Sequence, residues 1–536
     1  MKLQKTFGLP LVVLFLALSG LSRSYAQDQG VATPQTPTDQ AATAPKKLST
    51  NDKLKVLEAQ NQSLEERLKT LEDKVQSTAQ AVHMASPVVA PNPQDQVGPT
   101  GGGFEEESVA TTSGDYFDTE PRFLVFKGAN GAEFKLGGYF WSDLNINNQS
   151  FSVNQGVTLP PTYINGLVAN NDNAFTKMKS HLDFRVSFDK FVGGAIGLES
   201  DKHSSINVGF YHAYLTVKFD KFLRFRAGKF TNPLSLEGDQ PSAVLPFVEP
   251  SMVADLAVNK DFGAMLNGKV GDDLFEYWLE VANGQQDNES SATGPDPDGL
   301  SDFKALTARI FFTPWLRTSD EWLNGLGFGV AASMDNKSDG GENLPWQKIE
   351  TSIGGNSFLP SNTLSMKAAG DFYHLDAHGY YYNGPFGFLG EYIDSIQTIK
   401  STNSANLIAG AVPVQLTYSG WLAEVQWVIG GKAGFEGALV DHPFDPSKGQ
   451  WGALELVARM HGVFLDVKTF TVGFPYAPVS PLAYGAQVAT AYGVGFNWWL
   501  NENFKFMCDG EETDFSGGNE KIAPEQILVA RAAFTI

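Results

Sequence analysis

Basic side chains recur at every second position in one segment of the chain. Lys177, Lys179, His181 and Arg185 share this parity, and Asp183 is the acid among them. Alternate residues of an extended strand point to the same face, so the spacing places a row of positive charge on one side. Such a row can hold an anion weakly at several places and hand it on, which is the chemistry of a permeation path.

More charged residues alternate with apolar neighbours in the same way. From these we predict a set of pore-lining, anion-binding residues: Lys177, Lys179, Arg185, Lys218, Arg224, Arg226, Lys269, Arg309 and Arg459. Arg531 shares the pattern, as do the acids Asp143, Asp183, Glu276, Glu280, Glu424 and Glu455. Basic residues outnumber acids in this count. The alternative for each is a brace that pairs with an acid across the wall, as Arg459 could do with Glu455.

A second group of residues could bind a metal. His374, Asp376 and His378 lie two apart on a predicted strand and therefore share one face. They could ligate a metal ion or could be ordinary polar residues of an inner wall, and we favour the second interpretation. The chain has no Gly-x-Ser-x-Gly and no phosphate-binding loop followed by a helix. We therefore predict no catalytic residue, metal or cofactor.

The elements that carry these residues are predicted to be strands. Beyond Arg122 apolar and polar residues alternate, with turn residues between the segments, as in a transmembrane β-barrel. The connections alternate between short and long. We predict sixteen strands, at 132–146, 174–188, 191–201, 208–219, 222–230, 258–270, 274–283, 302–313, 325–335, 366–382, 386–396, 414–429, 451–465, 486–500, 503–515 and 524–536. Two connections, 314–324 and 430–450, are long for periplasmic turns, so the count could be wrong by one hairpin.

The N-terminal residues indicate export. Lys2 and Lys5 precede an apolar run from Leu9 to Leu18, and Ser24-Tyr25-Ala26 ends the segment with small residues where a signal peptidase cuts. We predict a signal peptide over 1–26. No later segment offers 18 unbroken apolar residues, so a membrane-bound form must be a closed barrel. The predicted fold is all-β, a 16-stranded antiparallel transmembrane β-barrel over 122–536 in the outer membrane.

A helix is predicted between the signal peptide and the barrel. Residues 27–46 have the composition of a disordered linker, and 85–121 form a second, Pro/Gly-rich linker. Between them, 47–84 carry an a/d seam: Leu54, Leu57, Asn61, Leu64, Leu68, Leu71 and Val75. Because Arg67 can face Glu72 of a parallel copy, we interpret 47–84 as an α-helical coiled-coil oligomerisation segment in the periplasm. A single amphipathic helix lying on its own protein is the alternative.

The third long connection, 231–257, is too apolar for a solvated loop tip. It carries Leu234, Leu236 and Phe247, and we predict that it folds into the lumen as a constriction; packing over the rim or on a neighbouring subunit is the alternative. The net charge of the chain is -21, with 60 Asp and Glu against 39 Lys and Arg, which argues against a nucleic-acid partner. The single cysteine, Cys508, excludes a disulfide within the chain.

Several segments in order resemble the phosphate-selective porin O and P family. They are Gly137 to Asp143, Lys177 to Phe188, Arg224 to Phe230 with Pro233 and Ser235-Leu236-Glu237, and Trp451 to Arg459. The resemblance covers 122–536 and implies a sixteen-stranded porin, a homotrimer with an inward third loop and a basic lumen that conducts anions. Its partners would be outer-membrane lipid and small anionic or hydrophilic solutes, phosphate or polyphosphate among them. A structural protein that tethers the membrane to the cell wall through the coiled coil is the alternative function.

Overall fold

The computed structural model describes the barrel part of the chain. The described residues are 123–128, 132–149, 174–188, 191–201, 208–271, 273–284, 304–318, 321–337, 349–359, 366–401, 413–470, 485–517 and 524–536. The predicted signal peptide, linker, coiled-coil helix and second linker (1–26, 27–46, 47–84 and 85–121) lie outside the described residues. Among the residues that are described, no helix has the length and apolar character that a membrane crossing requires.

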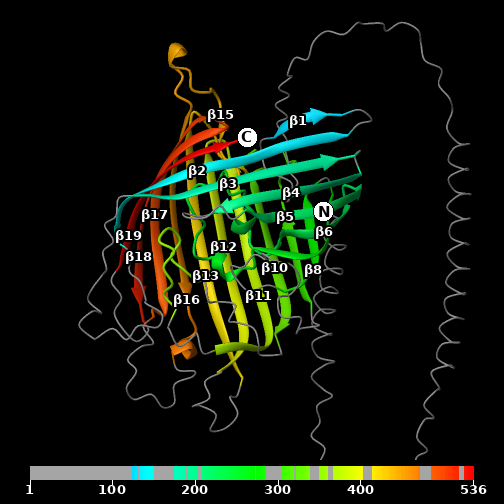
Figure 1. Cartoon of the computed structure of the whole chain (residues 1–536), viewed down its shortest axis with the longest axis vertical. Helices are drawn as coiled ribbons and strands as arrows, with labels where there is room; N and C mark the ends of the chain where they lie inside the picture. Colours follow the sequence, from blue (N-terminus) through cyan, green and yellow to red (C-terminus); the bar gives the residue numbers. More distant parts are fainter. Residues whose placement is uncertain are drawn as a thin grey trace, which may run out of the picture. The chain divides into compact units, whose positions relative to one another are not determined.

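Sixteen antiparallel strands form a closed wall, as predicted (Figure 1). They are β2 (Glu133–Gln149), β3 (Ala174–Ser187), β4 (Val192–Asp201), β5 (Val208–Asp220), β6 (Leu223–Thr231), β7 (Lys260–Val270), β8 (Phe275–Ala282), β9 (Ala305–Phe312), β10 (Leu326–Lys337), β11 (Met366–Asn383), β12 (Phe386–Ser401), β13 (Val414–Ile429), β16 (Ala453–Phe464), β17 (Val488–Asn501), β18 (Phe504–Ser516) and β19 (Glu525–Thr535). Neighbours in this order are hydrogen-bonded, and β19 pairs with β2 to close the ring. A short strand, β1 (Leu124–Lys127), pairs with β2 beyond the end of β19.

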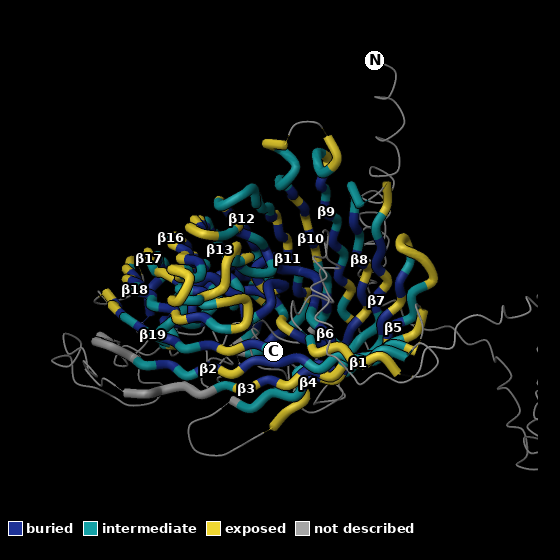
Figure 2. Tube along the Cα trace, turned by 90° about the horizontal axis from the view of Figure 1, so that it is seen from above, coloured by how far each residue is buried: buried dark blue, intermediate teal, exposed yellow. Residues whose placement is uncertain are grey.

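The two-residue period of each strand separates an apolar outer face from a polar inner face. Leu215 is 69% exposed whereas its neighbour Tyr214 is 8% exposed. Figure 2 shows exposed and buried residues alternating along the strands. The exposed large apolar side chains of the wall would be costly in water but favourable against lipid tails. The outer face therefore suits a bilayer, and the polar residues of the same strands are left to line the inside.

The connections sort by length onto the two ends of the barrel. The turns from β3 to β4, β5 to β6, β11 to β12 and β17 to β18 are short, and they share one end with the start of β2. The long connection 430–450 lies at this end too, and it holds a hairpin of its own, β14 (Gly431–Lys432) and β15 (Leu439–Val440). This hairpin forms a separate two-stranded sheet, so the predicted wall count of sixteen is unaffected.

The inside of the barrel is packed by chain segments that enter it. The third long connection, residues 232–259 and here called loop 3, contains the 3-10 turns η3 (Glu237–Asp239) and η4 (Ala254–Leu256). Leu234, Leu236 and Met252 of loop 3 are 0% exposed and join the main apolar cluster. The prediction that this loop folds into the lumen is therefore confirmed, and the alternative of packing over the rim is wrong.

Two more segments pack against loop 3 from opposite ends of the barrel. In the segment 349–359, from the connection between β10 and β11, Ile349, Phe358 and Leu359 are buried, and the Glu350 amide donates to Asp255 of loop 3 at 2.9 Å. From the other end, the segment 433–438 reaches loop 3, where Gln240 Nε2 donates to the Phe435 carbonyl at 3.4 Å. Buried apolar side chains of these segments, among them Phe358 and Phe435, thus occupy part of the lumen.

Candidate functional site

The predicted pore-lining residues lie on the inner face of the wall. Arg226 and Arg309 are each 1% exposed, Arg459 is 4% exposed, and all three alternate with less buried apolar neighbours. The same parity holds for the other described members of the predicted set, which are Lys179, Arg185, Lys218, Arg224 and Lys269. Lys177 lies on β3, but its side chain falls outside the described residues.

Several of these basic residues are paired with acids. Lys269 Nζ lies 3.2 Å from Glu276, Lys179 Nζ lies 3.2 Å from Glu199, and Arg185 Nη2 lies 3.0 Å from Asp183. These three basic residues therefore act at least partly as braces that pair with an acid of the wall. These pairs hold the basic side chains at the wall.

Arg459 has a different partner from the one expected. It donates from Nε and Nη2 to Glu511 at 3.0 and 2.7 Å, and from Nη1 to the Glu249 carbonyl of loop 3 at 2.8 Å. Glu455 instead accepts hydrogen bonds from Asn497 and Trp499. The expected pairing of Arg459 with Glu455 is wrong. The guanidinium is instead bonded to Glu511, which points inward from β18.

Loop 3 is held against this side of the wall by its backbone. Arg531 contacts the Val248 carbonyl, the Val248 amide donates to Asp509 at 2.7 Å, and Lys505 donates to the Leu245 carbonyl at 2.8 Å. Hydrogen bonds between a charged side chain and a backbone group are stronger than those between two neutral groups. The residues 245–249 are thereby fixed to β16, β18 and β19.

The two arms of loop 3 are joined to each other through one carboxylate. Glu237 accepts from the Ser251 amide at 2.7 Å and from the Ser251 hydroxyl at 2.5 Å, and its own amide donates to Glu391 of β12 at 2.8 Å. Asp239, on the next turn, pairs with Arg309 of β9. Burial raises the pKa of Glu237, and it raises the pKa of Asp239 to about 6 although the Arg309 guanidinium opposes that shift.

Acids outnumber bases among the buried residues that the structure describes. There are fifteen buried Asp and Glu against eight buried Lys and Arg. These counts include Glu237 and Asp239 of loop 3 and leave out the half-buried Lys179, Arg185, Lys218 and Lys269, so a net basic inner wall stays a prediction. The eight basic residues are Arg224, Arg226, Lys229, Lys260, Arg309, Arg459, Lys505 and Arg531. Acids that the prediction missed include Asp261, Asp335, Glu391, Asp509, Glu511 and Glu525. What matters for a solute is where each sign of charge meets the open space.

The two signs are distributed unevenly over the wall, although the strands β3 to β7, which carry most of the basic residues, also carry the buried acids Asp183 and Asp261. The strands β10 to β13 present the buried acids Asp335, Asp376, Glu391 and Glu424. Loop 3 covers this acidic sector, since η4 contacts β12 and β13 and the Glu237 amide binds Glu391. The opposite sector, β3 to β7, presents most of the basic residues: Lys179, Arg185, Lys218, Arg224, Arg226, Lys229, Lys260 and Lys269.

A hollow lies between this basic sector and loop 3. It is lined from the wall by Arg185, Tyr211, His212, Tyr214, Arg226, Phe230, Thr231 and Lys260, and from loop 3 by residues 238–242. The Arg226 guanidinium stacks 4.2 Å from the centre of the Tyr214 ring, and Lys260 Nζ lies 3.9 Å from that of Tyr211. Three cations therefore face the hollow, and Asp239 is the carboxylate among its lining residues.

Lys260 was missed because it breaks the alternation. The inner face of β7 carries the odd residues Asp261, Met265 and Lys269, which would place Lys260 outside. At the first residue of the strand the side chain turns inward, is 4% exposed and donates to Thr231 at 2.6 Å. Parity is a poor guide at strand ends, and no other signal in the sequence identifies this residue.

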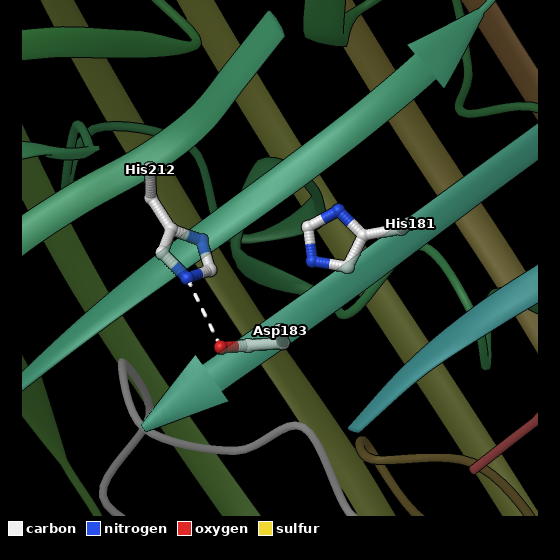
Figure 3. Close-up of side chains that lie close together, drawn as sticks. All are labelled: His181, Asp183 and His212. Carbon is white, nitrogen blue, oxygen red and sulfur yellow. Dashed lines mark hydrogen bonds and ion pairs between the residues drawn. The ribbon is translucent and has the colours of Figure 1, made fainter. Parts of the chain in front are cut away.

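The potential metal ligands that the structure brings together differ from the candidate trio on β11. His374, Asp376 and His378 share the inner face of β11 as expected, but His378 binds Asp376 and His374 binds Ser333 at 2.5 Å. Within the described residues, the group whose donor atoms converge is His181, Asp183 and His212 (Figure 3).

A closed barrel of sixteen strands with an apolar outside, a charged inside and a loop folded into the lumen defines an outer-membrane porin. The family model of the phosphate-selective porins O and P matches residues 174–534, and the chain belongs to this family. The expected resemblance is thus confirmed. A search of curated protein sequences gives no match.

Solved structures offer more distant likenesses. The outer membrane channel DcaP of Acinetobacter baumannii is 12% identical, with 77% of this chain and 99% of that chain covered and a TM-score of 0.46. OmpF of Salmonella typhi in complex with daunomycin is 11% identical, covering 77% and 100%, with a TM-score of 0.44. An anion-selective porin from Comamonas acidovorans is 9% identical, covering 76% and 100%, with a TM-score of 0.42. At these scores we transfer no property from them.

The Arg459–Glu511 pair yields a prediction about stability. Arg459→Met should lower the free energy of unfolding by about 3–5 kcal/mol, because Glu511 is then left as a buried charge without its main partner. Urea titration of the protein folded into lipid vesicles measures this. The double variant Arg459→Met/Glu511→Gln should recover part of the loss, and the exposed Arg317→Met should change stability by at most about 0.5 kcal/mol. A double variant no more stable than the single one would contradict the pairing.

Proposed function

We propose that this porin is a passive channel with a preference for small anions. The path runs through the hollow between strands β3 to β7 and residues 238–242 of loop 3. The observation that carries the proposal is the position of Arg185, Arg226 and Lys260 around that hollow. The mechanism is diffusion down a gradient, with no covalent step.

The distribution of the acids supports the same preference. Glu391 and Glu424 belong to the sector that loop 3 covers, and Glu511 is bound to Arg459. A carboxylate that protein atoms enclose acts on a solute only across those atoms, and nearby cations offset part of its charge. A cation that faces the hollow acts at close range. Charges at the hollow therefore dominate the barrier that an ion meets.

The chemistry of the lining favours oxyanions. Guanidinium groups offer a planar fork of donors that fits phosphate and carboxylate, and an ammonium offers a compact charge. Arg185 and Arg226 supply the first, and Lys260 supplies the second. Phosphate or polyphosphate is the solute class that this set fits best. The neighbouring aromatic rings hold Arg226 and Lys260 at the wall beside the hollow.

Replacing Arg226 tests the charge of the path. Arg226→Glu should reduce the anion-to-cation permeability ratio several-fold, because reversing one charge close to the path changes the barrier by on the order of 1–2 kcal/mol. The reversal potential across a planar bilayer in a salt gradient measures the ratio. Arg317→Glu makes the same charge change on an exposed turn and should leave the ratio unaltered. Cation-selective reversal by the unmodified protein would refute the proposal.

The pH dependence should follow Asp239. Burial sets the pKa of Asp239 at about 6, so this carboxyl is charged above pH 6 and neutral below it. Loss of its negative charge leaves the cations at the hollow less opposed, and anion preference should rise between pH 7.5 and pH 5. Asp239→Asn should already show the higher preference at pH 7.5. The difference in pH response between the two proteins gives the contribution of Asp239. Equal responses would exclude Asp239.

We further propose that the porin is a homotrimer, with residues 47–84 as a parallel coiled coil in the periplasm. The a/d seam and the Arg67–Glu72 pairing between copies support this assembly. The mass of the full chain in detergent should be that of three copies. Deleting 47–84 should lower the temperature at which the trimer dissociates on a gel. A monomeric full chain would contradict the trimer, and an unchanged dissociation temperature would contradict a role for the helix.

A further inference from the structure

His181, Asp183 and His212 converge over the strand that separates their own strands. Asp183 of β3 is in register with Gly197 of β4, and Gly197 is in register with His212 of β5. The three side chains are 3%, 0% and 7% exposed. Their donor atoms all lie within 4.8 Å of one another, and His212 Nε2 is 3.3 Å from Asp183 Oδ1. Figure 3 shows the three side chains directed toward a common point.

Gly197 makes this convergence possible. A Cβ atom at this position would lie 2.7 Å from His212 Cε1 and 2.9 Å from His181 Cε1. Real Cβ contacts are not that short, so any other residue would push the two imidazoles apart. The glycine thus provides the space in which two rings from β3 and β5 meet above β4.

The imidazole of His181 is buried and lacks a hydrogen-bond partner at either nitrogen in the described structure. Buried polar groups are normally bonded, and each exception calls for an explanation. The ring stacks on Tyr139, with centroids 5.0 Å apart, and meets Tyr211 edge-on at 4.8 Å. Aromatic neighbours thus hold the ring toward Asp183 and His212 without satisfying its nitrogens. A ligand at the common point would satisfy one of them.

Groups around the trio are suited to orient it. Glu199 Oε2 lies 3.8 Å from His181 Nδ1 and is held by the Tyr139 hydroxyl at 2.8 Å. Asp183 uses its other oxygen, Oδ2, to accept from Arg185 at 3.0 and 3.3 Å. A carboxylate beside the second nitrogen of a ligating histidine is the usual arrangement around a protein-bound metal. His181 Nε2, Asp183 Oδ1 and His212 Nε2 remain for the ion.

We propose that these three residues form a site for a divalent transition-metal ion. Two imidazoles and one carboxylate suit ions such as Zn²⁺ and are a poor set for Ca²⁺ or Mg²⁺, which prefer oxygen ligands. Tetrahedral coordination places donor atoms roughly 3.3 Å apart, a spacing that His212 and Asp183 already have. A rotation of the His181 ring brings in the third donor. Arg185 and Lys260 add positive charge nearby, so we expect micromolar affinity.

The site also bears on permeation, and this second part rests on the proposed function. His212 lines the hollow, so a bound ion adds two positive charges to its wall and leaves a fourth coordination position. An oxyanion in the hollow is a ligand for that position. Micromolar Zn²⁺ should therefore increase the preference for anions.

Binding is tested on the full-length porin in detergent, after treatment with a chelator. Titration calorimetry with Zn²⁺ should give one ion per chain, and Co²⁺ should develop the visible absorption of a tetrahedral site. His181→Gln and His212→Gln should each weaken binding at least tenfold, whereas His378→Gln, which changes another buried inner-face histidine, should not. Gly197→Ala should weaken binding without altering a ligand. Heat-dependent mobility on gels checks that every variant is folded.

Three outcomes would overturn parts of the proposal. The proposed site is wrong if the unmodified porin binds no Zn²⁺. It is also wrong if the His181→Gln/His212→Gln double variant binds Zn²⁺ as tightly as the unmodified porin does. If Zn²⁺ binds but the reversal potential is unchanged, the effect on permeation is wrong. If Zn²⁺ binds to a channel that has no anion preference, the site stands and the proposed function fails.

Discussion

The hydrocarbon interior of a membrane offers no hydrogen bonds, and the rest of this structure depends on that constraint. Every backbone amide and carbonyl of the wall must be bonded within the chain, which a sheet achieves only when it closes on itself. Closure assigns alternate residues to lipid and to the interior. With sixteen strands the interior is too wide for wall side chains to fill. Loop 3 and the segments 349–359 and 433–438 supply the packing that the wall cannot.

The asymmetric filling of the lumen determines which charges of the wall lie beside open space. The buried residues carry more acid than base, yet loop 3 covers the acidic sector at β12 and β13. Arg185, Arg226 and Lys260 line a hollow between the strands β3 to β7 and residues 238–242 of loop 3. The net charge of the chain, or even of its inner wall, is therefore a poor guide to selectivity. Selectivity depends on which charges face the open space.

Much of the fold could be predicted because it is encoded locally. Alternation along a strand and turn residues at its ends need no knowledge of distant residues, and all sixteen wall strands were found this way. The inward course of loop 3 followed from Leu234, Leu236 and Phe247. Lumen charges were harder to predict. Glu391 lies between the apolar residues Leu389 and Ile393 on its face of β12, which hid it, and the strand end hid Lys260. The convergence of His181 with His212 depends on the register of three strands and on Gly197, which no local pattern reveals.

The last strand of the chain completes the ring against the first strand of the wall. Arg531 of β19 binds Asp143 of β2 at 2.6 and 2.7 Å across this seam. The two partners are 388 residues apart, so the wall has two open edges until the C-terminal residues are available. Closure of the cylinder must therefore follow the synthesis of β19. A chain that stops before residue 524 lacks the strand that joins the two edges, and its exposed edges are templates for aggregation.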